Sequence, residues 1–355
     1  MTNSTGYTYT AIFFLLLIIA FVIKSLVHQR HFGKYSKLES LLKYFMIFLP
    51  MIYLFVIDLD WSFGLNFLPS QNSADLTWSV FHIGSLVVML IFMAILLARA
   101  PIDAKSQRRY LGGRLDAVDH TIFQLGLMMV GIEIFKQLVF LNLGDGLANY
   151  QWYGFPLQFC SVPIFLYPVS PLVKNKRIKN ALYSFIAIFT LVAGLSVMLV
   201  GGSVFTLNVS ISIHTMLWHG TMVIVASYVM VARKLGSKWR QYVEALIVLA
   251  ILVVIVQIVN VSFHFLSFKF PGLESFDGFF INPWASNQNM PVLSNIRIVL
   301  QESGMHVAFV GIIFTLLYLT TFAVGGLLIF GVARLIHRQV STKSHLNESQ
   351  VKVSL

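Results

Sequence analysis

The stretch TWSVFHIGSLVVMLIFMAILLAR, residues 77–99, indicates what kind of protein this chain forms. It is long enough to cross a hydrocarbon core about 30 Å thick, and it contains one histidine and no charged residue before Arg99. Similar runs recur along the chain, of whose 355 residues 57% are hydrophobic and only 11% are charged. Because a soluble domain cannot bury so much apolar surface, the sequence predicts an all-α, polytopic membrane helical bundle.

The apolar runs define the expected membrane spans. We count nine of them, at about 9–28, 41–59, 77–99, 120–142, 155–173, 180–202, 208–232, 240–266 and 303–336. We therefore expect two additional N-terminal transmembrane helices in residues 1–70 and a seven-helix core domain in residues 71–338. The polar segment 339–355 is expected to be a disordered cytoplasmic tail.

The charges between the runs predict the orientation of the spans. Basic residues cluster in the loops after the first, third, fifth and seventh runs and in the tail, whereas the intervening loops are acidic or nearly neutral. Basic loops favour the cytoplasmic side, so we expect the N-terminus outside and the C-terminus in the cytoplasm. The loop at 268–300, rich in aromatic residues and prolines, is the largest outer feature. It fits a lid or re-entrant segment and an ordinary interfacial loop equally well.

Several classes of function are excluded by simple counts. Cys160 is the only cysteine, so the chain has no intramolecular disulfide and no cysteine-based zinc site. The sequence contains no nucleotide-binding loop and no metal-binding helix signature. The formal net charge of +11 follows from the basic loops and does not require a nucleic-acid partner. We expect neither a metal ion nor a cofactor.

Polar side chains inside the spans are the functional candidates, because a charge in hydrocarbon is costly. Counted at about 1.5 Å per residue, they gather in the outer half of the bilayer on different helices. The candidates are His82, Glu133, Cys160, His214, His219 and Asn260. Each also has a structural interpretation. A membrane cysteine is usually a packing residue, a histidine or asparagine can bond a neighbouring helix, and Glu133 can pair with Lys136.

Prolines around Cys160 predict an irregular helix there. Pro163 has no N–H and cannot bond to the carbonyl of Phe159, and further prolines stand at 156, 168 and 171. Irregular backbone is tolerated in a membrane where it faces protein or a cavity. A thiol beside such a break can meet a base, which would activate it for attack on an ester carbonyl.

Two histidines in the run 208–232 are candidates for this base. His214 and His219 are separated by about 140° around an ideal helix, so they cannot point the same way. His219 is followed by Gly220, which allows close approach of another helix or of a substrate. We choose His219 as the base and keep His214 as a neighbouring group.

Several local patterns resemble a known family. They are TWSVFHIGSL (77–86), GIEIFKQL (131–138), FPLQFC (155–160), SIHTMLWHG (212–220), VQIVNVSFHFL (256–266) and FFINPWASNQN (279–289). In this order they resemble the YwaF-like integral membrane proteins of bacteria, which are related to a eukaryotic transmembrane ether-phospholipid acyltransferase. The resemblance implies a multi-pass protein of the bacterial cytoplasmic membrane. It also implies that Cys160 carries an acyl group as a thioester with His219 as its helper. Gln158 stands where the family has a histidine two residues before the cysteine.

Residues and resemblance together predict a membrane-embedded acyltransferase or transacylase at the outer leaflet. Cys160 would take a fatty acyl group from a membrane phospholipid and pass it to a lysolipid, an ether lipid or a lipoprotein. Glu133 would orient or charge a histidine, and His82 or Asn260 would donate to the oxyanion. The alternative is a non-enzymatic lipid or small-solute carrier, in which the same groups bind a head group or relay protons. A third possibility is a structural partner in which Cys160 is merely packed.

Overall fold

The structure is a computed structural model that describes residues 49–50, 52–54, 76–143, 150, 152–200, 204–206, 208–270, 273, 276–284 and 293–353. Within these residues the fold is helical, and the only β pairing is an isolated bridge between Tyr110 and Leu115. The predicted span at 9–28 and most of the one at 41–59 lie outside the described residues.

Six helical segments in the described residues are long and apolar enough to cross a membrane. They are α3 (Val80–Lys105), α4 (Ala117–Leu143), α6 (Lys176–Phe185) running through the π-helical turn η5 (Ile186–Thr190) into α7 (Leu191–Val200), α8 (Val209–Ala232), α9 (Trp239–Ser267) and α11 (Val307–Val353). The prediction of an all-helical fold with several membrane spans is thereby confirmed for this part of the chain. α11 continues as a helix to Val353, where we expected a disordered tail.

The predicted span at 155–173 is broken. It consists of the 3₁₀ turn η3 (Phe159–Ser161), the short helix α5 (Pro163–Val169) and the 3₁₀ turn η4 (Ser170–Leu172). Pro163 is the first residue of α5. The N–H of a first helical residue has no partner within the helix, so the missing N–H of proline costs nothing there. The prediction of an irregular helix beside Cys160 is confirmed. At about 1.5 Å per residue, however, the stretch is too short to cross the hydrocarbon core as one helix.

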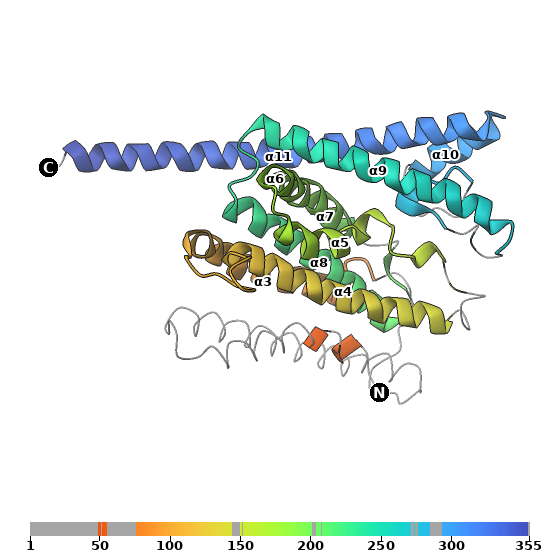
Figure 1. The fold of residues 1–355 in the computed structure, drawn as a ribbon, viewed down its shortest axis with the longest axis horizontal. Helices are drawn as coiled ribbons and strands as arrows, with labels where there is room; N and C mark the ends of the chain where they lie inside the picture. The colour runs from red at the N-terminus through yellow and green to blue at the C-terminus, as the bar shows by residue number, and fades with distance from the viewer. Residues whose placement is uncertain are drawn as a thin grey trace.

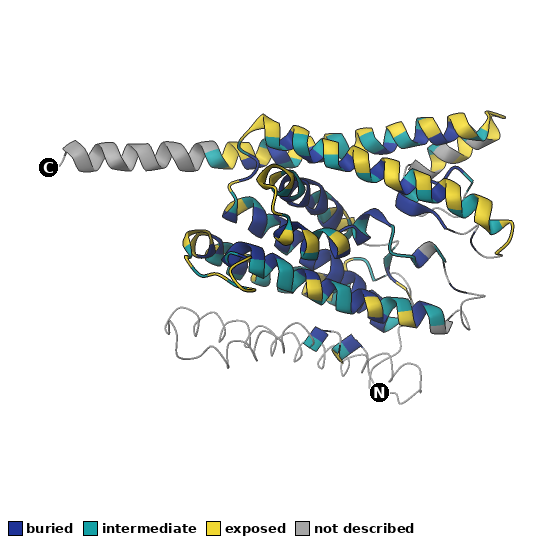
Figure 2. Ribbon diagram, viewed as in Figure 1, coloured by how far each residue is buried: buried dark blue, intermediate teal, exposed yellow. Residues whose placement is uncertain are grey.

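The helices form three layers (Figure 1). α8 lies in the middle layer with α5, α6 and α7. α3 and α4 form the layer on one side, and α9, α10 (Leu293–Glu302) and α11 form the layer on the other side. α8 packs against α3, α4 and α7 and against the turn η5, so 72% of its apolar stretch is buried, compared with 28% for α3. α9 packs on α6 and on α11, and α10 packs on α11 at the outside of the bundle. Figure 2 shows the same contrast, with a buried middle layer and many exposed positions on α9 and α11.

α9 shows how the sequence builds such an outer helix. One face carries the buried residues Ala245, Leu249, Val253, Val256 and Asn260. The other face carries the exposed residues Ile247, Ile251, Val254 and Ile258. Both sets recur every three or four residues, which is the helical period, so each forms a stripe. Since the exposed stripe is as apolar as the buried one, it suits contact with lipid rather than with water.

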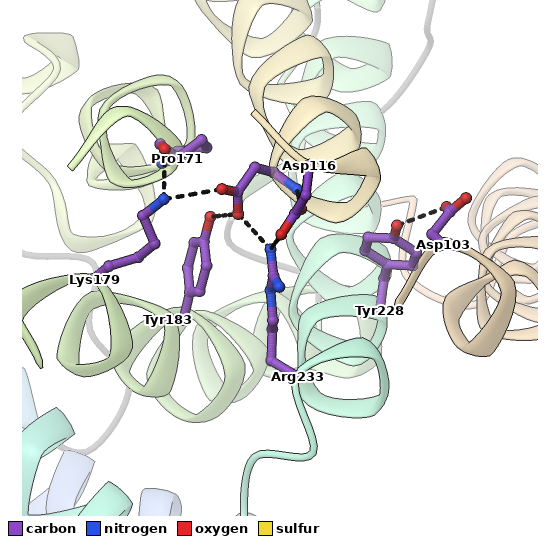
Figure 3. A network of polar contacts seen from close by, with 8 residues as sticks. Asp103, Asp116, Pro171, Lys179, Tyr183, Tyr228 and Arg233 are labelled. Carbon is purple, nitrogen blue, oxygen red and sulfur yellow. Dashed lines mark hydrogen bonds and ion pairs between the residues drawn. The ribbon is translucent and has the colours of Figure 1, made fainter. Parts of the chain in front are cut away.

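Ion pairs tie α4, α6 and α8 together at one end of the bundle (Figure 3). Arg233, the residue after α8, bonds both oxygens of Asp116 at 2.7 and 2.8 Å and also bonds Asp119 of α4. Lys179 of α6 bonds Asp119 Oδ2 at 2.9 Å, and the Tyr183 hydroxyl donates to Asp119 Oδ1 at 2.6 Å. We call these five residues the basic-end network. It brings the basic loops after α3, α5 and α8 to the same end of the bundle.

The charges in this network are mutually stabilising. Burial alone would raise the pKa of Asp116, but the backbone N–H of Asp119 and the guanidinium of Arg233 hold that pKa below its ordinary value. Burial alone would lower the pKa of Arg233, and the two carboxylates raise it instead. Nearby, the Tyr228 hydroxyl donates to Asp103 Oδ2 at 2.7 Å. The network therefore favours the ionised forms of Asp116 and Arg233.

Candidate functional site

The turn that carries Cys160 is held between α8 and the loop 276–284. The Trp218 indole of α8 donates through Nε1 to the Cys160 carbonyl at 2.7 Å. On the other side, the Gln158 amide donates to the Asp277 carbonyl at 2.8 Å, and the Phe279 N–H donates to the Leu157 carbonyl at 3.1 Å. Gln158 therefore anchors the turn to the loop.

His214 precedes Trp218, which bonds the Cys160 carbonyl, by four residues on α8. Its ring stacks on Trp218, with centroids 5.3 Å apart and 22° between the planes. Residues four apart share one face of a helix, so His214 and Trp218 point to the same side of α8. His214 Nε2 is buried and has no hydrogen-bond partner among the described residues. The structure thus places His214 on the face of α8 that meets the Cys160 turn.

His219 has one ring nitrogen bonded and the other free. Its Nδ1 lies 2.8 Å from the Thr215 carbonyl. A carbonyl oxygen only accepts, so Nδ1 carries the proton and Nε2 presents a lone pair. Nε2 is buried and finds no partner in the described part of the chain. In its neutral form His219 therefore has an acceptor that no described residue uses, and a general base requires such an acceptor.

Glu133 is half paired. Its Oε1 accepts from Lys136 Nζ at 2.7 Å and from Gln137 Nε2 at 2.6 Å, so the expected pairing with Lys136 is present. Gln137 also donates to the Gly154 carbonyl at 3.0 Å and accepts from the Tyr150 hydroxyl. Glu133 Oε2 is buried without a hydrogen-bond partner in the residues that the structure describes.

These groups lie in one part of the bundle. Lys136 is near enough to Cys160, His214 and His219 for its charge to act on each of them when that group is ionised. Tyr318 of α11, which we did not single out from the sequence, has its ring centroid 6.3 Å from that of Phe159, the residue before Cys160. We call Glu133, Lys136, Cys160, His214, His219 and Tyr318 the Cys160 cluster.

The two other candidate residues serve the fold. His82 Nδ1 accepts from the Trp78 N–H at 3.0 Å, so its Nε2 carries the proton and donates to the Met198 carbonyl at 2.8 Å. Asn260 donates to the Gln257 side chain and to the Gly278 carbonyl, both at 3.1 Å. In return it accepts from the Gly278 N–H at 2.8 Å. Both side chains join elements through hydrogen bonds that occupy the donors we considered for an oxyanion.

The described part of the large loop packs against the Cys160 turn. Phe279 is buried, and its ring lies 5.3 Å from that of Phe159 and 6.0 Å from that of Tyr318, measured between centroids. Phe279 and Phe280 adopt φ angles of 55° and 58°, a left-handed conformation that is costly for residues other than glycine. The surrounding hydrogen bonds therefore hold this segment in place over the turn. Residues 285–292 of the loop lie outside the described residues.

No group of three or more histidine, cysteine, aspartate or glutamate side chains in the described residues is placed to hold a metal ion. The groups at hand are a thiol, imidazoles, a carboxylate, an ammonium group and a phenol, gathered from α4, η3, α8 and α11. Such a set can exchange protons, supply a nucleophile or bind a polar head group.

Comparisons with known proteins agree with a membrane protein. Neither the curated proteins nor the solved structures contain a match to this chain. The model of the TMEM164 family matches residues 72–321, which is more than two thirds of the chain and includes every residue of the Cys160 cluster. The apolar helices and this match together identify a multi-pass membrane protein. The chain belongs to the TMEM164 family, a family of transmembrane proteins.

Proposed function

We propose that the protein is an acyltransferase embedded in the membrane, which moves a fatty acyl group from a phospholipid through a thioester on Cys160. The site lies in the outer half of the cytoplasmic membrane of a bacterium, with the N-terminus outside and the C-terminus in the cytoplasm. The acceptor is a lysolipid, an ether lipid or a lipoprotein. No cofactor takes part, because the lipid itself supplies the activated acyl group.

The observation that carries the proposal is the state of His219. Its tautomer is set by the Thr215 carbonyl, and its buried Nε2 lacks a partner within the described residues. An unpaired buried nitrogen costs free energy in the resting protein, so an idle role in packing does not account for it. His219 follows Trp218, whose indole bonds the Cys160 carbonyl, and this nearness to the only thiol of the chain supports a Cys–His pair.

In the first half of the reaction, His219 Nε2 takes the proton of the Cys160 thiol. The thiolate attacks the ester carbonyl carbon, a C–S bond forms, and the carbonyl electron pair moves to oxygen. When the tetrahedral intermediate collapses, the C–O bond breaks and the leaving alkoxide takes the proton from His219. The products are a thioester on Cys160 and a lysolipid. The acceptor hydroxyl then reverses these steps, with His219 again as the base.

Two other groups of the cluster assist. The Lys136 ammonium supplies positive charge near the forming thiolate, and its electrostatic interaction with Cys160 supports this role. The charge on Glu133 stabilises the imidazolium that forms when His219 takes the proton. The unpaired Oε2 of Glu133 is accounted for if a polar group of the bound lipid occupies it.

The single cysteine makes the test direct. The full-length protein is reconstituted in phospholipid nanodiscs, and its intact mass is measured before and after neutral hydroxylamine. We expect one hydroxylamine-sensitive acyl adduct, which can lie only on Cys160 because the chain has no other thiol. Cys160→Ala and Cys160→Ser should both lose this adduct and the transfer of acyl groups.

A carrier gives a different result in the same experiment. If the protein exchanges lipid between vesicles, carries no adduct, and keeps that exchange in both Cys160 variants, the acyltransferase is ruled out and the carrier remains. A protein that keeps neither adduct nor exchange behaves as a structural partner.

A further inference from the structure

Tyr318 occupies a fixed position beside the Cys160 turn. It is fully buried on α11, and its ring contacts those of Phe159, Phe279 and Phe322 at centroid distances of 6.3, 6.0 and 4.6 Å. Phe159 directly precedes Cys160, so this ring contact places Tyr318 beside the Cys160 turn. Three aromatic neighbours leave the ring little freedom, so the direction of its hydroxyl is set by packing.

The hydroxyl of Tyr318 is buried with no hydrogen-bond partner among the residues that the structure describes. The other fully buried tyrosines among the described residues are all paired. Tyr167 lies 3.1 Å from Thr190 Oγ1, Tyr183 donates to Asp119, and Tyr228 donates to Asp103. Buried tyrosine hydroxyls usually find a partner, because an unmade hydrogen bond costs free energy. The exception at Tyr318 leaves its hydroxyl available to a partner other than the described residues.

We propose that the Tyr318 hydroxyl is the donor that binds the carbonyl oxygen of the acyl ester at the Cys160 site. The inference rests on the proposed acyl transfer and adds the group that receives the negative charge. A phenol is neutral and protonated at ordinary pH, so it can donate without first changing its charge. The donors first considered for this task, on His82 and Asn260, are already bonded to protein carbonyls.

The role is specific to the tetrahedral step. As the Cys160 sulfur bonds to the carbonyl carbon, the electron pair of the C=O bond moves to oxygen, and the Tyr318 O–H donates to that oxygen. When the pair returns and the ester C–O bond breaks, the oxygen is a thioester carbonyl and Tyr318 keeps its proton. Tyr318 acts in the same way when the acceptor attacks the thioester.

Tyr318→Phe tests this inference, because it removes the hydroxyl and keeps the ring. We expect the rate of adduct formation on Cys160 to fall about 10²- to 10³-fold, the usual loss when one oxyanion donor is removed. The melting temperature should stay unchanged or rise, since the variant deletes a buried donor that has no partner among the described residues. Alkylation of Cys160 by iodoacetamide should proceed at the wild-type rate, because the hydroxyl acts on the substrate and not on the thiol.

The matched control is Tyr167→Phe, which removes an equally buried hydroxyl that is paired with Thr190. Its melting temperature should fall while its adduct forms at the wild-type rate. If Tyr318→Phe forms adduct as fast as wild type, or loses as much thermal stability as Tyr167→Phe, the assignment of Tyr318 is wrong and the acyltransferase stands. If wild type itself forms no adduct, both fail together.

Discussion

The basic-end network and the Cys160 cluster use buried polar groups in opposite ways. In the network, both oxygens of Asp116 and both oxygens of Asp119 have partners, whereas Arg233 Nε has none among the described residues. In the cluster, a carboxylate oxygen of Glu133, the Nε2 atoms of His214 and His219 and the hydroxyl of Tyr318 have none within the described residues. Paired groups stabilise the fold, whereas unpaired ones weaken it and are retained where a ligand or a reaction needs them. Substitutions should therefore affect stability in the network and activity in the cluster.

The largest effect is expected at His219. His219→Asn keeps an amide that can donate to the Thr215 carbonyl but deletes the free nitrogen. Formation of the acyl adduct should fall about 10²- to 10⁴-fold, the usual contribution of a general base, with little change in melting temperature. Rates are measured by intact mass over time in nanodiscs.

His82 provides the comparison for that variant, because its two ring nitrogens bond Trp78 and Met198. His82→Asn should lower the melting temperature and leave the rate of adduct formation per folded molecule unchanged. If the two variants lose activity and stability in the same proportion, the contrast between paired and unpaired groups does not hold.

The next effect is expected in the basic-end network. Asp119→Asn leaves Lys179 without its carboxylate and removes one of the two carboxylates of Arg233. The free energy of unfolding should fall by about 3 kcal/mol, the lower end for a broken buried ion pair, because Arg233 keeps Asp116. Unfolding by denaturant in micelles measures it.

The control for the network is an exposed ion pair on the same bundle. Arg240 and Glu244 pair at 2.8 Å near the start of α9, and Arg240 is 70% exposed. Glu244→Gln should change the free energy of unfolding by about 0.5 kcal/mol or less. A loss as large as that of Asp119→Asn would mean that burial does not set the strength of these pairs.

The smallest effect is a dependence on pH. The pKa of Asp116 is below its ordinary value of 3.8 in the folded protein, so the unfolded chain binds more protons in acid. The stability that this carboxylate contributes is fully present above about pH 4 and is lost as pH falls through the lower folded pKa. We expect a loss of about 1 kcal/mol or less, because the pair is partly exposed.

Asp116→Asn isolates that contribution. The difference in unfolding free energy between wild type and variant should be constant from pH 5 to 8 and should shrink in more acidic buffer. A difference that grows as the pH falls would contradict the sign.

Much of the core could be predicted from the sequence, and the exception is instructive. Long apolar runs predicted α3, α4, α8, α9 and α11, because a helix that crosses lipid must be apolar over its whole length. The run at 155–173 is also apolar but is divided at Pro163 and again after α5. Hydropathy does not distinguish a continuous span from a broken one. Here the prolines in the run predicted the break.

The candidate site was predicted less completely. Glu133, Cys160, His214 and His219 stood out because ionisable groups are rare in apolar runs. Tyr318 and Trp218 did not stand out, because aromatic residues are common in such runs. The sequence does not show whether the hydroxyl or indole N–H of such a residue has a role. The partner of Trp218, the Cys160 carbonyl, lies 58 residues away along the chain.

The sequence by itself determined that this protein is a helical membrane bundle whose buried polar groups are few. Both conclusions follow from composition and period, since the cost of placing a residue in lipid depends on its own chemistry. Only the tertiary structure decided which of those groups are already bonded. His82 and His219 look alike in the sequence, but one has both nitrogens occupied and the other does not. A hydrogen bond depends on where a distant segment places its carbonyl or N–H, and that placement exists only after the helices have packed.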